Sequence, residues 1–475
     1  MLSKSLKNNW MISTSILSLG RKKDNNYKER LLKVIPGGCH TYSRGFDQFP
    51  NNAPDILDRG KGAYVWDMKN NRYIDYGMGL RSVTLGYANR RVNRAAYKQI
   101  QKGNGLTRAS SVELEAAEEI INVIPCAEMV KFAKNGSNVT TAACKIARAY
   151  NGKKYIAIPE EQPFFSFDDW FIGKTKIDKG IPKEHSSLTL KFQYGNIQSV
   201  KRLFEQYPGM ISAIMLEPST HITPCNDDCN LMSAQSTKLT SNREREDNFL
   251  VKLKEICNKN SAILIFDEMI TGFRWDLGGA QSYFGVEPDM ATFGKAMANG
   301  FSLAALVGRR ELLELGNIID EGKERTFLLS STHGAEMSSL GAFLETIKIY
   351  KREEVTKKLW EKGSYFKQNF NEISRELGIE DKVYVEGPGV ALNYRTKNIN
   401  GDDCLKSRTF FAQELASRNI LMPWISLSTS HTNTILDKTL EMIKESLAKY
   451  KDALNTDLDE KIKGHVIKPV FRKYN

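Results

Sequence analysis

The stretch ILIFDE at residues 263–268, followed by TGFR at residues 271–274, decides the fold. Four successive apolar residues without alternation predict a strand that is buried on both faces, as in a parallel sheet covered by helices. Asp267 and Glu268 stand directly after these apolar residues. The strand therefore ends in two carboxylates, which makes its end the first place to look for chemistry.

The pattern around this strand predicts an α/β fold. Amphipathic helices alternate with short apolar strands from about residue 92, which is typical of a mostly parallel sheet flanked by helices. The expected helices are 92–102, 112–123, 139–150, 200–206 and 249–258, and the expected strands are 129–133, 155–158, 211–216, 263–266, 290–293 and 303–307. Beyond residue 330 we expect a smaller α+β unit, with helices at 336–350, 354–377 and 436–450 and a strand near 390–394.

The chain also divides by composition. Two short runs, 63–66 and 72–75, flank a turn that contains Asn70 and Asn71, which predicts a hairpin. We expect a basic N-terminal tail at 1–26, a hairpin segment at 27–85 that joins the smaller unit, a large domain at 86–330 with a polar surface insertion at 219–247, a small domain at 331–455 and a basic tail at 456–475.

Charge and composition exclude several classes of protein. The 475 residues are 41% apolar and 26% charged, which is typical of a globular protein, and no apolar run approaches the roughly 18 residues of a membrane span. Of the net charge of +12, ten charges lie in residues 1–23 and 461–475. The near-neutral body argues against a nucleic-acid groove, and we expect both basic ends to be solvated extensions.

The cysteines bear on the compartment. Seven scattered cysteines form no closely spaced framework, so we expect a reducing, cytoplasmic location. The basic, hydroxyl-bearing residues 1–23 leave organelle targeting open.

Two kinds of enzyme place an acid at the end of a buried strand. A nucleoside triphosphatase uses it to hold magnesium, and GKT at 173–175 is half of a phosphate-binding loop. The other half is missing, because Asp168 stands where a glycine is required and Trp170 and Phe171 are too bulky for backbone amides to wrap around phosphates. A pyridoxal phosphate enzyme uses the acid to hold the protonated pyridine nitrogen. The second interpretation is favoured.

A pyridoxal phosphate enzyme needs a lysine that forms an imine with the cofactor aldehyde. Lys295 follows the expected strand 290–293 with only Gly294 between them. Small neighbours predict partial burial, which lowers the pKa of the amine and frees it to attack. A single lysine is ordinarily a solvated surface residue, so Lys295 gains weight only from the motifs around it.

A phosphate cradle and an aromatic face complete the set. Residues 135–138 read NGSN between a strand and a helix, where free amides and the Ser137 hydroxyl suit a dianionic phosphate. The same pattern also serves as a plain helix cap. Phe164 and Phe165 offer a ring to stack on the pyridine, although core packing explains most such pairs.

These motifs together resemble the class III, fold-type I pyridoxal phosphate aminotransferases, and most of all the glutamate-1-semialdehyde 2,1-aminomutase-like branch. The similarity runs from about Tyr27 to Tyr450. Its motifs are VIPGG at 34–38, the hairpin at 62–76, FAKNGS at 132–137, Glu217-Pro218, FDEMITGFR at 266–274 and TFGK at 292–295.

The resemblance implies the cofactor pyridoxal 5'-phosphate and a role for each matching residue. Lys295 would be the imine lysine and proton shuttle, and Asp267 would pair with the pyridine nitrogen. Thr332, in STHG at 331–334, matches a threonine that completes the phosphate site of the partner subunit, which implies a homodimer with shared active sites. The remaining cofactor-binding residues would be Met269 under the ring, Phe164 on it, and Gly136 and Ser137 at the phosphate.

Two arginines are candidates for substrate binding. Arg44 falls where the aminomutases place a carboxylate-binding arginine, and a planar guanidinium suits a planar carboxylate. A surface salt bridge explains Arg44 equally well. Arg81 is a second candidate for the same purpose. The substrates are expected to be a small amino donor and a small carbonyl compound.

Departures from the family pattern bear on the reaction. The aminomutases carry a Phe-Glu-Ala-Gly segment whose acid acts as a gate, whereas residues 423–428 read PWISLS. A mutase keeps its diamine intermediate bound, so the missing gate favours simple transamination with release of product. Residues 164–166 and 299–302 differ as well, and such variants resemble aminotransferases of surface polysaccharide and amino-sugar pathways.

We expect the chain to transfer an amino group between two substrates. Two alternatives stay open. The chain could be the aminomutase itself, or it could be a non-catalytic homologue, although the retained Lys295 and Asp267 argue against the second. His221, Cys225 and Cys229 are spaced like zinc ligands on a helix, but Pro224 and the polar surroundings argue against a helix there, and we expect no metal.

Overall fold

The computed structural model describes residues 26–225, 248–334 and 336–475. Almost all of the expected N-terminal tail, and residues 226–247 of the expected surface insertion, lie outside the described residues. No described helix is long and apolar enough to cross a membrane.

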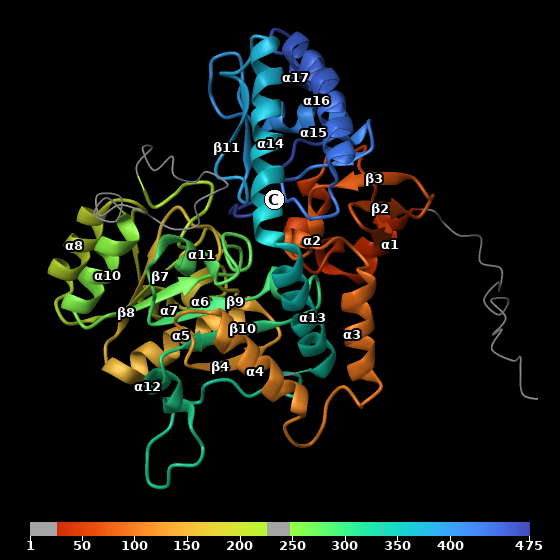
Figure 1. Ribbon diagram of the computed structural model, residues 1–475. Coiled ribbons are helices and arrows are strands. Elements are labelled where there is room, and N and C mark those ends of the chain that lie inside the picture. Colours follow the sequence, from red (N-terminus) through yellow and green to blue (C-terminus); the bar gives the residue numbers. More distant parts are fainter. Residues whose placement is uncertain (1–25, 226–247, 335) are drawn as a thin grey trace, which may run out of the picture.

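A seven-stranded sheet organises the larger part of the molecule, with strand order β4-β10-β9-β8-β7-β5-β6 (Figure 1). Only β10 runs against its neighbours β4 and β9, so the expected mostly parallel sheet is confirmed. The strands are β4 (Met129–Ala133), β5 (Tyr155–Pro159), β6 (Thr189–Phe192), β7 (Ile211–Leu216), β8 (Ile263–Asp267), β9 (Met290–Phe293) and β10 (Ala304–Gly308).

Helices cover both faces of this sheet, which explains the unbroken apolar run in β8. Leu264 and Phe266 face a core built with α10 and α13, whereas Ile263 and Ile265 face a core built with α5. Each such side chain, once buried, stabilises the fold by about 1.5–3 kcal/mol. The helices are α3 (Arg90–Ile100), α4 (Ser111–Val123), α5 (Gly136–Asn151), α6 (Asp169–Ile172), α7 (Lys183–Ser187), α8 (Ile197–Gln206), α10 (Phe249–Lys259), α11 (Gly279–Phe284), η4 (Lys295–Ala298), α12 (Arg310–Leu313), η5 (Glu314–Gly316) and α13 (Met337–Glu353).

A second group of elements combines both ends of the chain and stands at the top in Figure 1. The strand β3 pairs in parallel with β13, so the N-terminal hairpin and the C-terminal residues share one sheet of order β1-β2-β3-β13. The N-terminal elements are α1 (Tyr27–Val34), η1 (Pro36–Gly38), η2 (Tyr42–Arg44), η3 (Phe46–Gln48), β1 (Leu57–Lys61), β2 (Tyr64–Asp67), β3 (Arg72–Asp75) and α2 (Met78–Arg81). The C-terminal ones are α14 (Val355–Glu376), β11 (Val383–Glu386), β12 (Asn393–Thr396), α15 (Leu405–Ala416), β13 (Ile420–Leu421), α16 (Asn433–Ala453) and α17 (Leu458–Lys461).

The basic C-terminal residues are not a solvated extension, so this expectation was wrong. Lys463 N donates to Gln413 Oε1 at 2.7 Å, and Ile467 N donates to Thr409 Oγ1 at 2.9 Å. Ile462 and Ile467 are buried, each with 9% of its surface exposed. The physical reason is that the basic residues are interspersed with apolar ones that reach α15, so the lysines can keep their ammonium groups in solvent while the apolar side chains are buried.

Candidate active site

Lys295 lies at the edge of the large sheet where β9 ends. Its φ of +42° is a left-handed conformation that costs a residue with a side chain roughly 1–2 kcal/mol. Strain of this kind persists where the surroundings impose it, and it clusters at functional sites. Gly294 precedes it, and a Cβ there would stand 2.6 Å from Met269 Sδ, so a larger residue would displace that side chain. Burial lowers the pKa of the Lys295 amine; the carboxylates of Glu217 and Asp267 oppose this effect, and Arg81 and Arg274 add to it.

Asp267 ends the neighbouring parallel strand, where it is in register with Thr292. Its Oδ1 accepts hydrogen bonds from Met269 N at 3.0 Å and from Thr292 Oγ1 at 3.1 Å. Both partners orient one oxygen and leave Oδ2 for a further donor. Only 3% of the surface of Asp267 is exposed. This burial raises the pKa of Asp267 to about 6, although the Met269 amide, Lys295 and Thr292 each lower it. A cation beside Oδ2 would relieve that cost.

Glu217 belongs to the same site, although we did not predict it as a site residue. It follows β7, the strand on the other side of β8, and is 7% exposed. Gln162 fixes its backbone through two hydrogen bonds of 2.8 Å, one to Glu217 O and one from Glu217 N. Burial raises the pKa of Glu217 to about 7, Asp267 raises it further, and Lys295 and Arg81 lower it. The signal was available, because the carboxyl ends of neighbouring parallel strands meet at one edge.

Two arginines add positive charge to this edge. Arg274 is buried, and its guanidinium donates to the carbonyl of Arg81. Burial lowers the pKa of Arg274 to about 10, and it also lowers the pKa of Arg81, which Glu217 opposes. Both arginines keep their positive charge near pH 7, so they are the groups here that can face an anionic ligand.

The structure treats the two predicted substrate arginines differently. Arg81 is half-buried, with φ of +67°, among the charges that act on Lys295. Arg44 is exposed in η2, and its charge acts on Tyr87, whose hydroxyl donates to Asp75 Oδ2 at 2.6 Å. Arg81 is therefore brought to the site, and Arg44 lies on the N-terminal segment beside it.

The start of α5 carries Gly136 and Ser137, for which we predicted a phosphate cradle. Asn135 is the N-cap and accepts from Asn138 N, so the amides of Gly136 and Ser137 are left without a partner inside the helix. Ser137 is buried, and its Oγ accepts from Phe167 N at 3.0 Å, which leaves its hydroxyl proton free to donate elsewhere. A Cβ on Gly136 would stand 2.9 Å from Met269 Sδ. Met269 therefore lies between the cradle and Lys295.

Phe164 and Thr332, the remaining predicted cofactor-binding residues, are both exposed. Phe164 is 44% exposed and contacts Phe171 edge-on at 5.8 Å and Phe471 at 6.4 Å, measured between ring centroids. Thr332 is exposed in the long connection before α13.

The structure also bears on the partial phosphate-binding motif and on the zinc hypothesis. Gly173 ends α6 instead of opening a helix, so the residues 173–175 do not have the geometry of a phosphate-binding loop. His221 Nε2 lies 3.8 Å from Glu386 Oε1, and no group of three potential metal ligands exists among the described residues. Cys229, the third residue of the zinc hypothesis, lies outside them.

The residues present fit pyridoxal phosphate. A buried carboxylate with one oxygen left for a donor suits a protonated ring nitrogen, and a strained, half-buried lysine with a lowered pKa suits an aldehyde. A helix start with free amides suits a phosphate.

The sequence is similar to those of known enzymes over most of its length. The sequence model of the family "Aminotransferase class-III" matches residues 49–221 and 242–403. The 3-aminobutyryl-CoA aminotransferase of Cloacimonas acidaminovorans is 30% identical over 439 residues, which are 90% of this chain and 97% of that protein. The glutamate-1-semialdehyde 2,1-aminomutase of Aquifex aeolicus is 27% identical over 445 residues, covering 90% of this chain and 99% of that protein.

Solved structures share the fold. The "PLP internal aldimine form" of the FumI protein from Sphingopyxis sp. MTA144 superimposes with a TM-score of 0.76 at 23% identity, over 90% of this chain and 96% of that one. The second matched stretch, residues 242–403, includes both Asp267 and Lys295. The chain is a member of the class III aminotransferase family, and with it of the pyridoxal phosphate-dependent enzymes.

Proposed function

We propose that the protein is an aminotransferase that moves an amino group from an amino donor to a small carbonyl acceptor. The observation that carries this proposal is the pair of neighbouring strands β8 and β9, which end in Asp267 and, after one glycine, Lys295. Pyridoxal phosphate supplies the electron sink that such a transfer requires. Ser137 and the first amides of α5 would hold its phosphate, and Asp267 would hold its ring nitrogen.

Lys295 is the residue that would move the proton. A lowered pKa keeps a larger share of its amine neutral near pH 7, and only the neutral amine accepts a proton from the α-carbon of a bound amine. Lys295 follows β9, the parallel neighbour of the strand that ends in Asp267, so we expect its amine to reach a ring held at Asp267. The same amine would hold the cofactor between turnovers.

Arg81 would bind an anionic group of the substrate. Its position among the charges that act on Lys295 supports a carboxylate-bearing substrate, because an arginine stays charged and binds planar carboxylates through two parallel hydrogen bonds. When no substrate is bound, the carboxylate of Glu217 would offset part of the positive charge of Arg81. A small amino acid or keto acid fits this arrangement.

A transaminase is supported over an aminomutase by the segment 423–428. Trp424 Nε1 donates to Gly77 O at 3.1 Å, and Ser426 N donates to Tyr76 O at 2.9 Å. These bonds tie the segment to the N-terminal part of the chain, and it carries no acid. A tethered, uncharged segment is poorly suited to gate a diamine intermediate.

The test uses the holoenzyme and a panel of amino acids and primary amines. We expect at least one donor to bleach the visible absorbance band of the bound cofactor, and a keto acid to restore it. With glutamate-1-semialdehyde alone we expect no isomeric product. An isomer formed without any donor would assign the aminomutase reaction instead.

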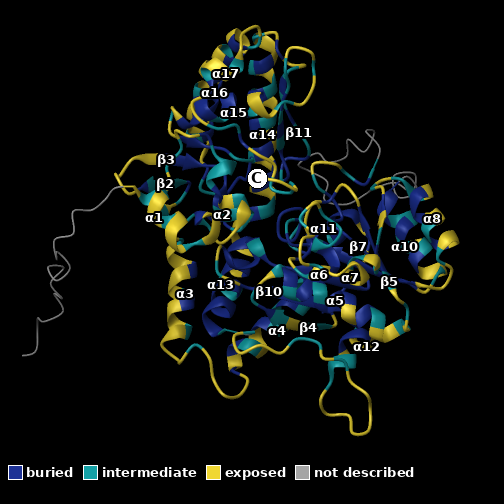
Figure 2. Ribbon diagram, turned by 180° about the vertical axis from the view of Figure 1, so that it is seen from behind, coloured by how far each residue is buried: buried dark blue, intermediate teal, exposed yellow. Residues whose placement is uncertain are grey.

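We also propose a homodimer in which Thr332 serves the partner's phosphate site. The connection 317–334 projects below α12, exposed along most of its length (Figure 2). Ile318, Ile319 and Phe327 on it are 77%, 80% and 69% exposed. Large apolar side chains exposed together indicate a surface that another protein covers.

Replacing Ile318 and Ile319 by Asp together is expected to weaken the dimer by at least about 100-fold, because a two-fold interface loses each side chain twice and each is worth about 1.5–3 kcal/mol. Sedimentation equilibrium measures the dissociation constant. Glu321→Gln, an exposed change in the same connection, should leave it unchanged. A monomeric wild-type protein at micromolar concentration would contradict the proposal.

The raised pKa of Glu217 predicts a pH-dependent stability of the cofactor-free protein. Because the folded state binds this proton more tightly than the unfolded chain, the stabilisation is present below about pH 4.5 and is lost as the pH rises through about 7. The loss amounts to roughly 3 kcal/mol. Urea unfolding at pH 5 and pH 8 should show this fall in the wild type and a smaller one in Glu217→Gln. Glu205→Gln, exposed on α8, should follow the wild type, and an unchanged slope in Glu217→Gln would refute the assignment.

A further inference from the structure

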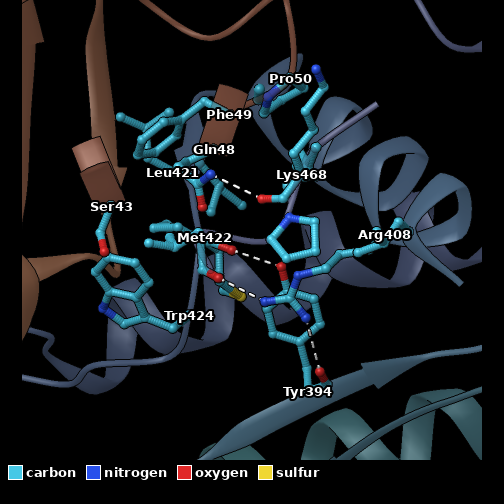
Figure 3. Close-up of a pocket in the computed structure, with 18 residues that line it drawn as sticks. Ser43, Gln48, Phe49, Pro50, Tyr394, Arg408, Leu421, Met422, Trp424 and Lys468 are labelled. Carbon is cyan, nitrogen blue, oxygen red and sulfur yellow. Dashed lines mark hydrogen bonds between the residues drawn. The ribbon is translucent and has the colours of Figure 1, made fainter. Parts of the chain in front are cut away.

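The C-terminal segment, defined here as residues 462–475, returns to the N-terminal loop that carries Arg44. Lys468 N donates to Asp47 O at 3.0 Å, and Gln48 Nε2 donates to Lys468 O at 2.9 Å (Figure 3). His465 Nε2 lies 2.9 Å from Phe46 O. These contacts bind the C-terminal segment to η3, two residues after Arg44.

An ion pair closes this contact. Arg472 and Asp47 lie 2.6 Å apart, with 26% and 30% of their side chains exposed, so solvent screens the pair only in part. Neither η2 nor η3 has a side-chain cap of its own. The contacts with the C-terminal segment therefore add to the few backbone bonds that the loop 42–48 makes within itself.

The same segment reaches the rim of the cofactor site. The ring of Phe471 lies 6.4 Å from that of Phe164 at 34°, within the range of favourable aromatic pairs. Three residues after Phe164, the amide of Phe167 donates to Ser137 Oγ in the phosphate cradle. One segment thus touches both the loop of Arg44 and the loop of Phe164.

Packing accounts for only the first part of this path. Ile462 and Ile467 are buried, and the backbone of Lys463 and Ile467 donates to α15. Residues 467–470 then border a pocket of about 350 Å³ that Tyr394 and Trp424 also line (Figure 3). Beyond this pocket, Phe471 contacts Phe164 and Arg472 pairs with Asp47, so the end of the segment is tied to two loops.

We propose that the C-terminal segment is part of the active site, with Phe471 as a positioning residue for the ring of Phe164 and Arg472 as the anchor that holds the segment on the loop of Arg44. The inference rests on the proposed function, because it assigns Phe164 to the cofactor ring. Its test measures cofactor binding and loop opening, neither of which requires turnover.

Phe471→Ala is expected to raise the dissociation constant of the apoenzyme for pyridoxal phosphate about tenfold, equivalent to about 1.4 kcal/mol. It should also change the visible circular dichroism of the bound cofactor, because Phe164 loses its neighbour. Phe471→Tyr keeps the ring and should restore both values. Lys473→Ala, whose exposed amine lies over Tyr474, is the matched control and should bind like the wild type.

Arg472→Ala is expected to release both loops. Tryptic cleavage after the exposed Arg44, followed by mass spectrometry, should be about fivefold or more faster than in the wild type, because it reports local opening of the loop. The dissociation constant for pyridoxal phosphate should rise as in Phe471→Ala. Arg472→Lys should restore slow cleavage.

Truncation after Pro469 decides the inference. If the truncated protein binds pyridoxal phosphate and is cleaved after Arg44 within about twofold of the wild type, the proposal is overturned. Equal losses in Phe471→Ala and Phe471→Tyr would overturn the positioning role. A wild-type apoenzyme that does not bind the cofactor at all would instead refute the proposed function, so the two failures are distinguishable.

Discussion

Lys295→Ala is expected to lower the rate of the amino-transfer half-reaction by on the order of 10⁴ or more. General acid–base catalysis by a positioned side chain alone contributes 10²–10⁴, and this variant also loses the covalent hold on the cofactor. Rapid mixing with an amino donor, followed through the visible absorbance of the cofactor, measures the rate. The cofactor should still bind, because Asp267 and Ser137 lie on separate elements that the substitution does not touch.

Two comparisons separate chemistry from folding. Lys131→Ala removes an exposed lysine of β4 and should keep the full rate. Lys295→Arg keeps a positive charge at the strained position and should be almost as slow as Lys295→Ala, because a guanidinium is neither a nucleophile nor a base near pH 7. A half-reaction in Lys295→Ala within about tenfold of the wild type would exclude Lys295 as the proton carrier.

The sequence predicts the centre of the fold well, because burial on both faces leaves a plain signal. The run at 263–266 becomes β8, and its alternating side chains enter two separate cores. Asp267 and Lys295 come together because their strands are parallel neighbours, so their ends meet. Although 28 positions separate the two residues in the sequence, their proximity can be predicted once both strands are recognised.

Elements at the edges carry weaker signals and were missed. The strand β6 has one neighbour only, and its Lys191 interrupts the apolar pattern. The strand β13 has two residues and is recognisable only through its pairing with β3. An edge strand is stabilised by the strand beside it more than by its own residues. The pattern of apolar residues within such a strand therefore gives only a weak prediction.

The rim of the site depends on contacts that no local pattern contains. The charges of residues 461–475 predict a solvated tail, but the ring of Phe471 and the guanidinium of Arg472 find partners more than 300 positions away. The left-handed backbone of Arg81 is likewise set by its surroundings, since isolated arginines avoid it. Long-range partners of this kind become visible only in three dimensions.

Asp267→Asn is the second change with a large expected effect. An ion pair at about 4 Å in an effective dielectric near 20 is worth about 4 kcal/mol, and the amide cannot form one with a ring nitrogen. Asn keeps the size of the side chain and can still accept from Met269 N and Thr292 Oγ1. The fold should therefore survive while the half-reaction slows by about 10³-fold.

The adjacent acid is the matched control for this prediction. Glu268 is buried as deeply, but its oxygens accept from the Ala280 amide at 2.8 Å and the Gln281 amide at 2.9 Å, which ties it to α11. Glu268→Gln should lower the melting temperature and leave the rate of the folded enzyme nearly unchanged. The pH profile adds a second criterion: because burial raises the pKa of Asp267 to about 6, cofactor affinity should fall below that pH in the wild type and stay flat in Asp267→Asn. If Asp267→Asn instead melts early and reacts at the wild-type rate, Asp267 is a structural acid and the ring nitrogen must be held elsewhere.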